Sequence, residues 1–154
     1  MPFKVLGIDP GLVDSGAVQL TFVEEAKALY IWYETFRYPV LPDISSHNHY
    51  IFIEDYTPRS HFENDPKMQQ LVRDIKQKTG GKVIRNQGVK KVITPQVLKA
   101  FQCDRFTGGS NHSDLQSAAR IGLLGAARTD EGNRLIFNYL SDYVQGKPWA
   151  VAKT

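Results

Sequence analysis

Apolar residues fall into short strand-like runs in the first half of the chain and into helical spacings in the second half. The runs are rich in β-branched and aromatic residues, which predicts β-strands. The first three runs are joined by short polar connections, so we expect an antiparallel meander. The predicted strands span residues 4–9, 15–23, 28–38, 50–54 and 82–85, and residues 92–93 are also strand-like.

Helices are indicated by capping residues followed by apolar spacing of three and four. Asn64 or Asp65 before Pro66 begins one helix, and Thr94 before Pro95 begins another. The predicted helices span residues 66–78, 95–101, 111–128 and 130–144. Strands mixed with helices predict an α/β domain over residues 1–144, followed by a C-terminal tail over residues 145–154.

Composition narrows the class of protein. The chain has 154 residues, which fits one domain, and 42% hydrophobic with 23% charged residues excludes wholesale disorder. A single cysteine, Cys103, excludes a disulfide framework and a zinc cluster built from cysteines. The sequence contains no apolar stretch of about 18 residues and no signal-peptide layout. We therefore expect no membrane association and a cytoplasmic location.

Charge is distributed unevenly along the chain, although the net charge is only +3. Residues 1–77 contain 7 basic and 11 acidic side chains, whereas residues 78–154 contain 12 basic and 5 acidic ones. The basic half indicates a polyanionic partner or, equally, an unevenly charged surface with no specific role.

Carboxylates stand at positions where a charge is difficult to place. Asp9 ends one apolar strand, Glu54 ends another, and Asp114 lies in the first turn of a helix rich in small residues. Buried carboxylates need a partner, a proton or a metal ion. If the three converge, they provide oxygen ligands for hard divalent cations. Two such ions about 4 Å apart can align a water molecule and stabilise the leaving oxygen in phosphodiester hydrolysis.

Four segments, in order over residues 4–127, resemble motifs of the RuvC-like Holliday-junction resolvases, in the RNase H-like superfamily. Val5-Leu6-Gly7-Ile8-Asp9-Pro10-Gly11 with Ser15-Gly16-Ala17-Val18 resembles the first motif, and Ile51-Phe52-Ile53-Glu54 the second. Val92-Ile93-Thr94-Pro95 resembles the segment before the last motif, and Asn111 to Ala119 (NHSDLQSAA) resembles the last motif. The resemblance implies an RNase H-like fold with a central mixed five-stranded sheet flanked by helices.

The resemblance also implies site residues and a cofactor. Asp9, Glu54 and Asp114 match the metal-binding carboxylates, which implies two Mg²⁺ ions per site, with Mn²⁺ as a substitute. Where the family has an Asp or His three residues before the last acid, this chain has the uncharged Asn111, with His112 beside it. Asp55 competes with Glu54, because adjacent strand residues point to opposite faces. The motif favours Glu54.

The basic stretch from Lys82 to Arg105 could bind the phosphates of a nucleic acid without recognising its base sequence. Arg59 and Phe62, shortly after Glu54, fall in a region that touches the junction in the similar family. The candidate nucleic-acid-binding residues are Lys82, Arg85, Lys90, Lys91, Lys99, Arg105, Arg59 and Phe62.

The sequence therefore predicts a magnesium-dependent endonuclease acting on four-way or other branched DNA. The resemblance implies a homodimer, for which the helix at 66–79 is a candidate interface unless the domain core uses its apolar positions. The short connection at 39–49 is typical of trimmed, phage-type members acting in a host cytoplasm. Two alternatives stay open: an RNase H-like nuclease acting on RNA or flap DNA, and a non-catalytic junction-binding module. An actin-like ATPase is excluded by length.

Overall fold

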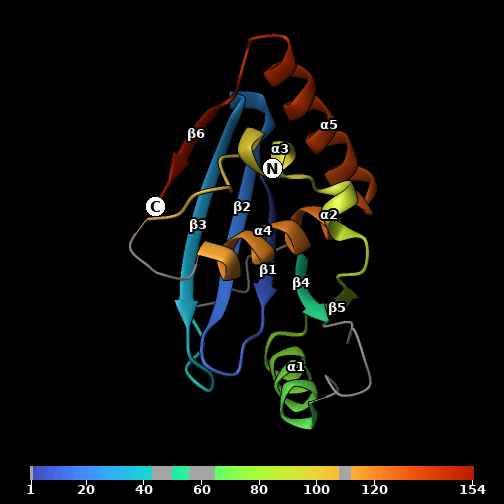
Figure 1. The fold of residues 1–154 in the computed structure, drawn as a ribbon. Coiled ribbons are helices and arrows are strands. Elements are labelled where there is room, and N and C mark those ends of the chain that lie inside the picture. Colours follow the sequence, from blue (N-terminus) through green and yellow to red (C-terminus); the bar gives the residue numbers. More distant parts are fainter. Residues whose placement is uncertain (1, 43–49, 56–64, 108–111) are drawn as a thin grey trace.

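A sheet of six strands, covered by helices on both faces, makes up the part of the chain that the structure describes (Figure 1). This computed structural model describes residues 2–42, 50–55, 65–107 and 112–154. Its strands are β1 (Phe3–Asp9), β2 (Ser15–Val23), β3 (Ala28–Phe36), β4 (Tyr50–Asp55), β5 (Lys82–Arg85) and β6 (Ala150–Lys153). Its helices are η1 (Glu24–Ala26), α1 (Pro66–Thr79), α2 (Val89–Val92), α3 (Pro95–Ala100), α4 (His112–Ala127) and α5 (Asp130–Val144). None of these described helices has the length and apolarity needed to cross a membrane.

The order of the strands is β5-β4-β1-β2-β3-β6. The first three strands form the expected antiparallel meander, while β4 runs parallel to β1, and β5 runs parallel to β4. This mixed sheet with flanking helices confirms the predicted α/β architecture, with six strands where five were expected. Parallel pairing brings the C-terminal ends of β1 and β4 to the same edge of the sheet.

The two faces of the sheet bury separate apolar clusters. Adjacent residues of β1 point to opposite faces of the sheet. Leu6 and Ile8 therefore pack toward α1, while Val5 belongs to the cluster beneath α4. The buried residues of α1 complete the smaller cluster; they are Leu71, Val72 and Ile75. The apolar positions that the sequence offered for a dimer interface on this helix are thus used by the domain core.

Helix α4 lies directly against the backbone of the sheet. A Cβ atom added at Gly7 in β1 would lie 1.9 Å from the carbonyl oxygen of Ala118, and one added at Gly16 in β2 would lie 2.8 Å from that of Asp114. Any side chain at these positions would push the helix away. The two glycines thereby set the height of Asp114 above the ends of β1 and β2.

The C-terminal segment differs from the sequence prediction. Residues 145–154 were expected to be a tail, but they contribute β6, which pairs in parallel with β3. The anchor is Trp149, which is buried against Phe22 and Tyr139 and donates its indole N–H to Asp142. The four-residue strand has no strong hydrophobic alternation of its own, so this distant packing decides its pairing.

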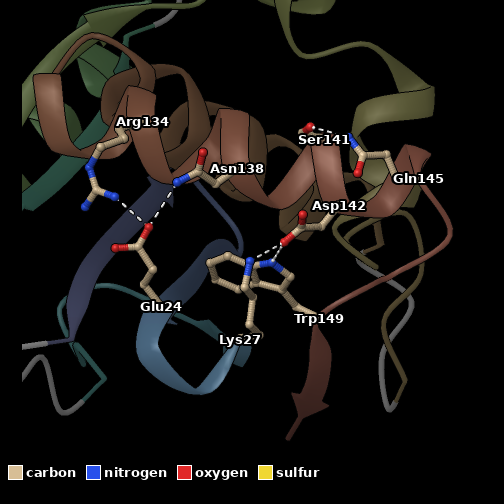
Figure 2. A network of polar contacts seen from close by, with 8 residues as sticks. All are labelled: Glu24, Lys27, Arg134, Asn138, Ser141, Asp142, Gln145 and Trp149. Carbon is tan, nitrogen blue, oxygen red and sulfur yellow. Dashed lines mark hydrogen bonds and ion pairs between the residues drawn. The ribbon is translucent and has the colours of Figure 1, made fainter.

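Polar contacts join the turn after β2 to helix α5 (Figure 2). Glu24 accepts hydrogen bonds from Arg134 at 2.5 Å and from Asn138 at 3.0 Å, and Lys27 pairs with Asp142 at 2.6 Å. Exposed ion pairs contribute little to stability individually. Their arrangement nevertheless defines how α5 and the start of β6 meet the β2–β3 end of the sheet.

The stretch at residues 92–93 was predicted to be strand-like, which is wrong. The chain forms the short helix α2 there, because Val89 and Ile93 are both buried and the amide of Ile93 donates to the carbonyl of Val89 at 2.8 Å. In a helical turn a spacing of four places both side chains on one side, and Val92 between them is left 57% exposed.

We expect Gly7→Ala to destabilise the protein by about 3 kcal/mol, because the new methyl group would overlap the backbone of α4. Urea unfolding followed by circular dichroism measures this. Gly146→Ala is the control: its left-handed φ of 76° penalises alanine, but no atom lies within 4 Å of the new Cβ. The control should lose only about 1 kcal/mol. Equal losses in the two variants would contradict the close approach of α4.

Candidate active site

Three acidic residues from different parts of the chain meet at one edge of the sheet. Asp9 ends β1, Glu54 is the penultimate residue of β4, and Asp114 lies in the first turn of α4. Ile8 pairs with Ile53, so the two carboxylates that follow them lie at the same level of neighbouring strands. Each of the three is half-buried. The convergence follows from strand pairing and from the seating of α4, neither of which is local in sequence.

The orientation of Glu54 follows from the alternation of β4. Phe52 belongs to the core cluster beneath α4, and two residues later Glu54 points to the same face. Its neighbour Asp55 points to the opposite face. The structure thus brings Glu54, rather than Asp55, to the edge where Asp9 and Asp114 lie.

Asp9 has the most strongly shifted pKa of the three acids. Burial, followed by the nearby charges of Glu54 and Asp114, raises the pKa of Asp9 to about 9. Asp9 shares a hydrogen bond with Asp114, and the protonated Asp9 is the donor. A carboxyl group with such a pKa holds its proton at neutral pH unless a cation replaces that proton.

Glu54 has neighbours of both signs. Burial raises its pKa and the charge of Asp114 adds to this, while a hydrogen bond from the Asn86 amide, 2.9 Å from Glu54 Oε1, opposes the rise. The charges of Lys90 and Arg120 also oppose it. The neutral amide of Asn86 therefore holds the Glu54 side chain in place, and nearby positive charges compensate its negative charge only in part.

The pKa of Asp114 is also raised. Burial raises its pKa, the hydrogen bond from Asp9 lowers it, and the charge of Asp14 in the β1–β2 connection raises it again. One proton held between Asp9 and Asp114 relieves part of the repulsion among the acids. The remaining repulsion is what a divalent cation would remove.

The donor set is made of oxygen atoms alone, which suits Mg²⁺ or Mn²⁺ rather than a soft metal. Within the described ranges, no three His, Cys, Asp or Glu side chains already surround a common point as metal ligands do. Asp9 and Asp114 face one another through their shared proton instead. Loss of that proton and small side-chain rotations would be needed to admit a cation.

Two residues of this site were missed by the sequence reasoning. Asn86 directly follows β5 and reaches Glu54, and Arg120 is buried on α4, where its Nε donates to the carbonyl of Ile93 at 3.1 Å. Burial lowers the pKa of Arg120. A lone Asn after a strand carries no motif signal. For Arg120 the sequence did contain a signal, because an arginine within a run of small residues on a helix indicates a buried charge.

Several predicted site residues lie outside the described residues. Arg59, Phe62 and Asn111 fall in undescribed segments, and although His112 begins α4, its side chain is not described. Their assignments stay predictions.

The six described basic candidates are all exposed but do not form one patch. Lys90 in α2 reaches Glu54 electrostatically, so Lys90 and the adjacent Lys91 lie near the acids. Arg85 pairs with Asp55 at the end of β5 and, like Asp55, points to the opposite face of the sheet. Lys82 begins β5, three residues back from the carboxylate edge, and Lys99 lies on α3, toward the other end of the sheet (Figure 1).

Arg105, the remaining basic candidate, lines a separate hollow of about 580 Å³ together with Tyr33, Phe106 and Lys153. The hollow lies on the β3–β6 side of the sheet, whereas Arg85, Lys90 and Lys91 lie on the β4–β5 side. The basic candidates are thus divided between two sides of the acidic edge.

Comparison with known proteins finds similarity among solved structures. No family model and no curated protein matches the chain. Among solved structures, "T. thermophilus RuvC in complex with Holliday junction substrate" is similar over 96% of this chain and 98% of that chain, with 12% sequence identity and a TM-score of 0.47. A likeness at this level transfers no residue role and no activity.

We expect the stability of the protein in EDTA to fall as pH rises from about 4 to about 9, because folded Asp9 keeps a proton that the unfolded chain releases in this range. Asp9→Asn removes this titration, so its melting temperature should depend less on pH and exceed that of wild type at pH 8. Thermal unfolding across pH measures both effects. Asp55→Asn, on the opposite face of β4, is the control; a wild-type slope in Asp9→Asn would contradict the assignment.

Proposed function

We propose that this protein is a divalent-metal-dependent endonuclease that cleaves branched DNA, with the four-way junction as its principal substrate. The observation that carries the proposal is the convergence of Asp9, Glu54 and Asp114 from three elements onto one edge of an RNase H-like sheet. The order and content of the motifs that resemble RuvC-like resolvases support the choice of substrate.

Asp9, Glu54 and Asp114 would hold two Mg²⁺ ions. When bound, the ions supply positive charge to the scissile phosphate and lower the pKa of water, which makes it a nucleophile at neutral pH. Asp9 must lose its proton first, so cation affinity should rise with pH. Asn86 holds Glu54 in position through its amide. No side chain is needed as the nucleophile, which agrees with the burial of Cys103, whose pKa is raised to about 12.

The exposed cations of the site edge would bind the DNA backbone. Lys90 and Lys91 would contact phosphates next to the scissile bond without reading sequence. A homodimer would place two such sites on the two symmetric strands of a junction. The short segment at 39–49 agrees with a trimmed, phage-type member acting in the cytoplasm of a host cell.

The decisive experiment compares cleavage of a labelled four-way junction, a linear duplex, a flap and an RNA–DNA hybrid in Mg²⁺. We expect the junction to be cut fastest. Asp9→Asn, Glu54→Gln and Asp114→Asn should each slow cleavage by about a thousandfold, equivalent to about 4 kcal/mol. Asp55→Asn is the matched control and should retain wild-type activity.

Each of the other outcomes of this experiment would contradict part of the proposal or favour an alternative function. Full activity of Asp9→Asn would refute the metal assignment. Linear duplex cut as fast as the junction would refute resolvase function, and preferred cleavage of the hybrid or the flap would favour the other RNase H-like nucleases. Junction binding without cleavage in either Mg²⁺ or Mn²⁺ would identify a non-catalytic binding module.

Asn86 acts as a positioning residue in this proposal, and Asn86→Ala should weaken Mg²⁺ binding by about 10- to 100-fold, because Glu54 loses the donor that orients it. The Mg²⁺ concentration at half-maximal cleavage should rise by that factor, while the rate at saturating Mg²⁺ changes much less. Asn133→Ala, an exposed asparagine on α5, is the control. An unchanged Mg²⁺ dependence would show that Glu54 is held without Asn86.

A further inference from the structure

Two turns beside the acidic edge present apolar side chains to solvent. Leu12 and Val13, in the β1–β2 connection, are 53% and 67% exposed, and Val40, in the turn after β3, is 73% exposed. Both turns lie at the end of the sheet where β1 and β3 finish (Figure 1). Single exposed apolar residues are ordinary. Three of them on adjoining turns next to a group of half-buried acids indicate a contact surface.

These turns are held in place by polar contacts. Arg37 joins them: its Nε donates to the carbonyl of Val13 at 3.1 Å, its Nη2 lies 3.4 Å from Asp14 Oδ1, and its own carbonyl accepts from the amide of Val40 at 3.0 Å. Inside the first turn, the amide of Gly11 donates to Ser15 Oγ at 3.0 Å. The apolar tips therefore project from an ordered frame, so presenting them to a partner costs little further conformational entropy.

The short spacing in sequence between Asp9 and Leu12 limits how far the apolar tips can lie from the scissile phosphate. Leu12 follows Asp9 by three residues, so their Cα atoms are at most about 11 Å apart. Successive nucleotides of one strand rise about 3.4 Å along the helix axis, so this reach corresponds to about three nucleotides. The Arg37 side chain, itself 71% exposed, adds a cation suited to a phosphate beside the tips.

We propose that Leu12 and Val13 form a wedge that enters the branch point of the DNA and unstacks the base pair there, while Arg37 holds the adjacent backbone. This inference rests on the proposed function and makes the wedge the source of the preference for branched DNA. Apolar side chains are the groups that proteins insert between base steps. At a branch point the stacking is already interrupted, so insertion costs less there than in a continuous duplex. Cleavage is then confined to within about three nucleotides of the branch point.

The wedge is tested with 2-aminopurine, a base whose fluorescence rises when it is unstacked, placed at the branch point of a four-way junction. Binding is measured in Ca²⁺ to separate it from cleavage. Wild type should raise the fluorescence several-fold on the junction and leave it unchanged on a linear duplex. The double variant Leu12→Ser, Val13→Ser should lose most of the rise. Val144→Ser, which alters an 82% exposed valine on α5, should behave as wild type.

The outcomes distinguish the wedge from the proposed function. A full fluorescence rise with the double variant, or no rise with a wild-type protein that cleaves junctions, overturns the wedge and leaves the nuclease intact. A rise with wild type that is lost in the double variant, without any cleavage in Mg²⁺, supports the wedge and overturns the nuclease. Absence of binding to branched DNA overturns both. Cleavage mapped further from the branch point than about three nucleotides also contradicts the wedge.

Discussion

Direct contact between the backbone of α4 and the strands beneath it is the constraint on which the rest of the site depends. Gly7 and Gly16 leave no side chain between the helix and the sheet, and the carbonyls of Ala118 and Asp114 occupy that space. A side chain at either glycine would push α4 away from the strands and carry Asp114 away from Asp9. The acidic site is thus a product of backbone packing first and of side-chain chemistry second.

This packing places like charges together, which works against stability. Burial and mutual repulsion drive a proton onto Asp9, and among the described residues Asn86, Lys90 and Arg120 oppose the rise in the pKa of Glu54. A fold selected for stability alone would replace such acids with apolar residues, as buried ion clusters generally can be. Their presence in an otherwise well-packed sheet supports the proposed binding of a divalent cation.

Much of the fold could be predicted from the sequence because its signals are local. The strands that carry Asp9 and Glu54 are apolar runs bounded by turns, and α1 and α3 begin with strong caps. The pairing of β6, the helical turn at α2 and the role of Asn86 depend on contacts between residues far apart in the chain. Spacing reveals none of these, and the convergence of the three acids became visible only through strand register and the seating of α4.

The pairing of β6 with β3 has a consequence for the order of folding. Thr154 bonds to the carbonyl of Ile31, 123 residues earlier, and Lys153 bonds to the carbonyls of Gln102 and Arg105. During synthesis, the first half of β3, Ala28–Ile31, therefore has no outer partner strand until β6 has been made. Open edges recruit strands from other chains, and contacts this distant in sequence slow folding. Newly made chains should be most prone to aggregate in the interval before β6 covers β3.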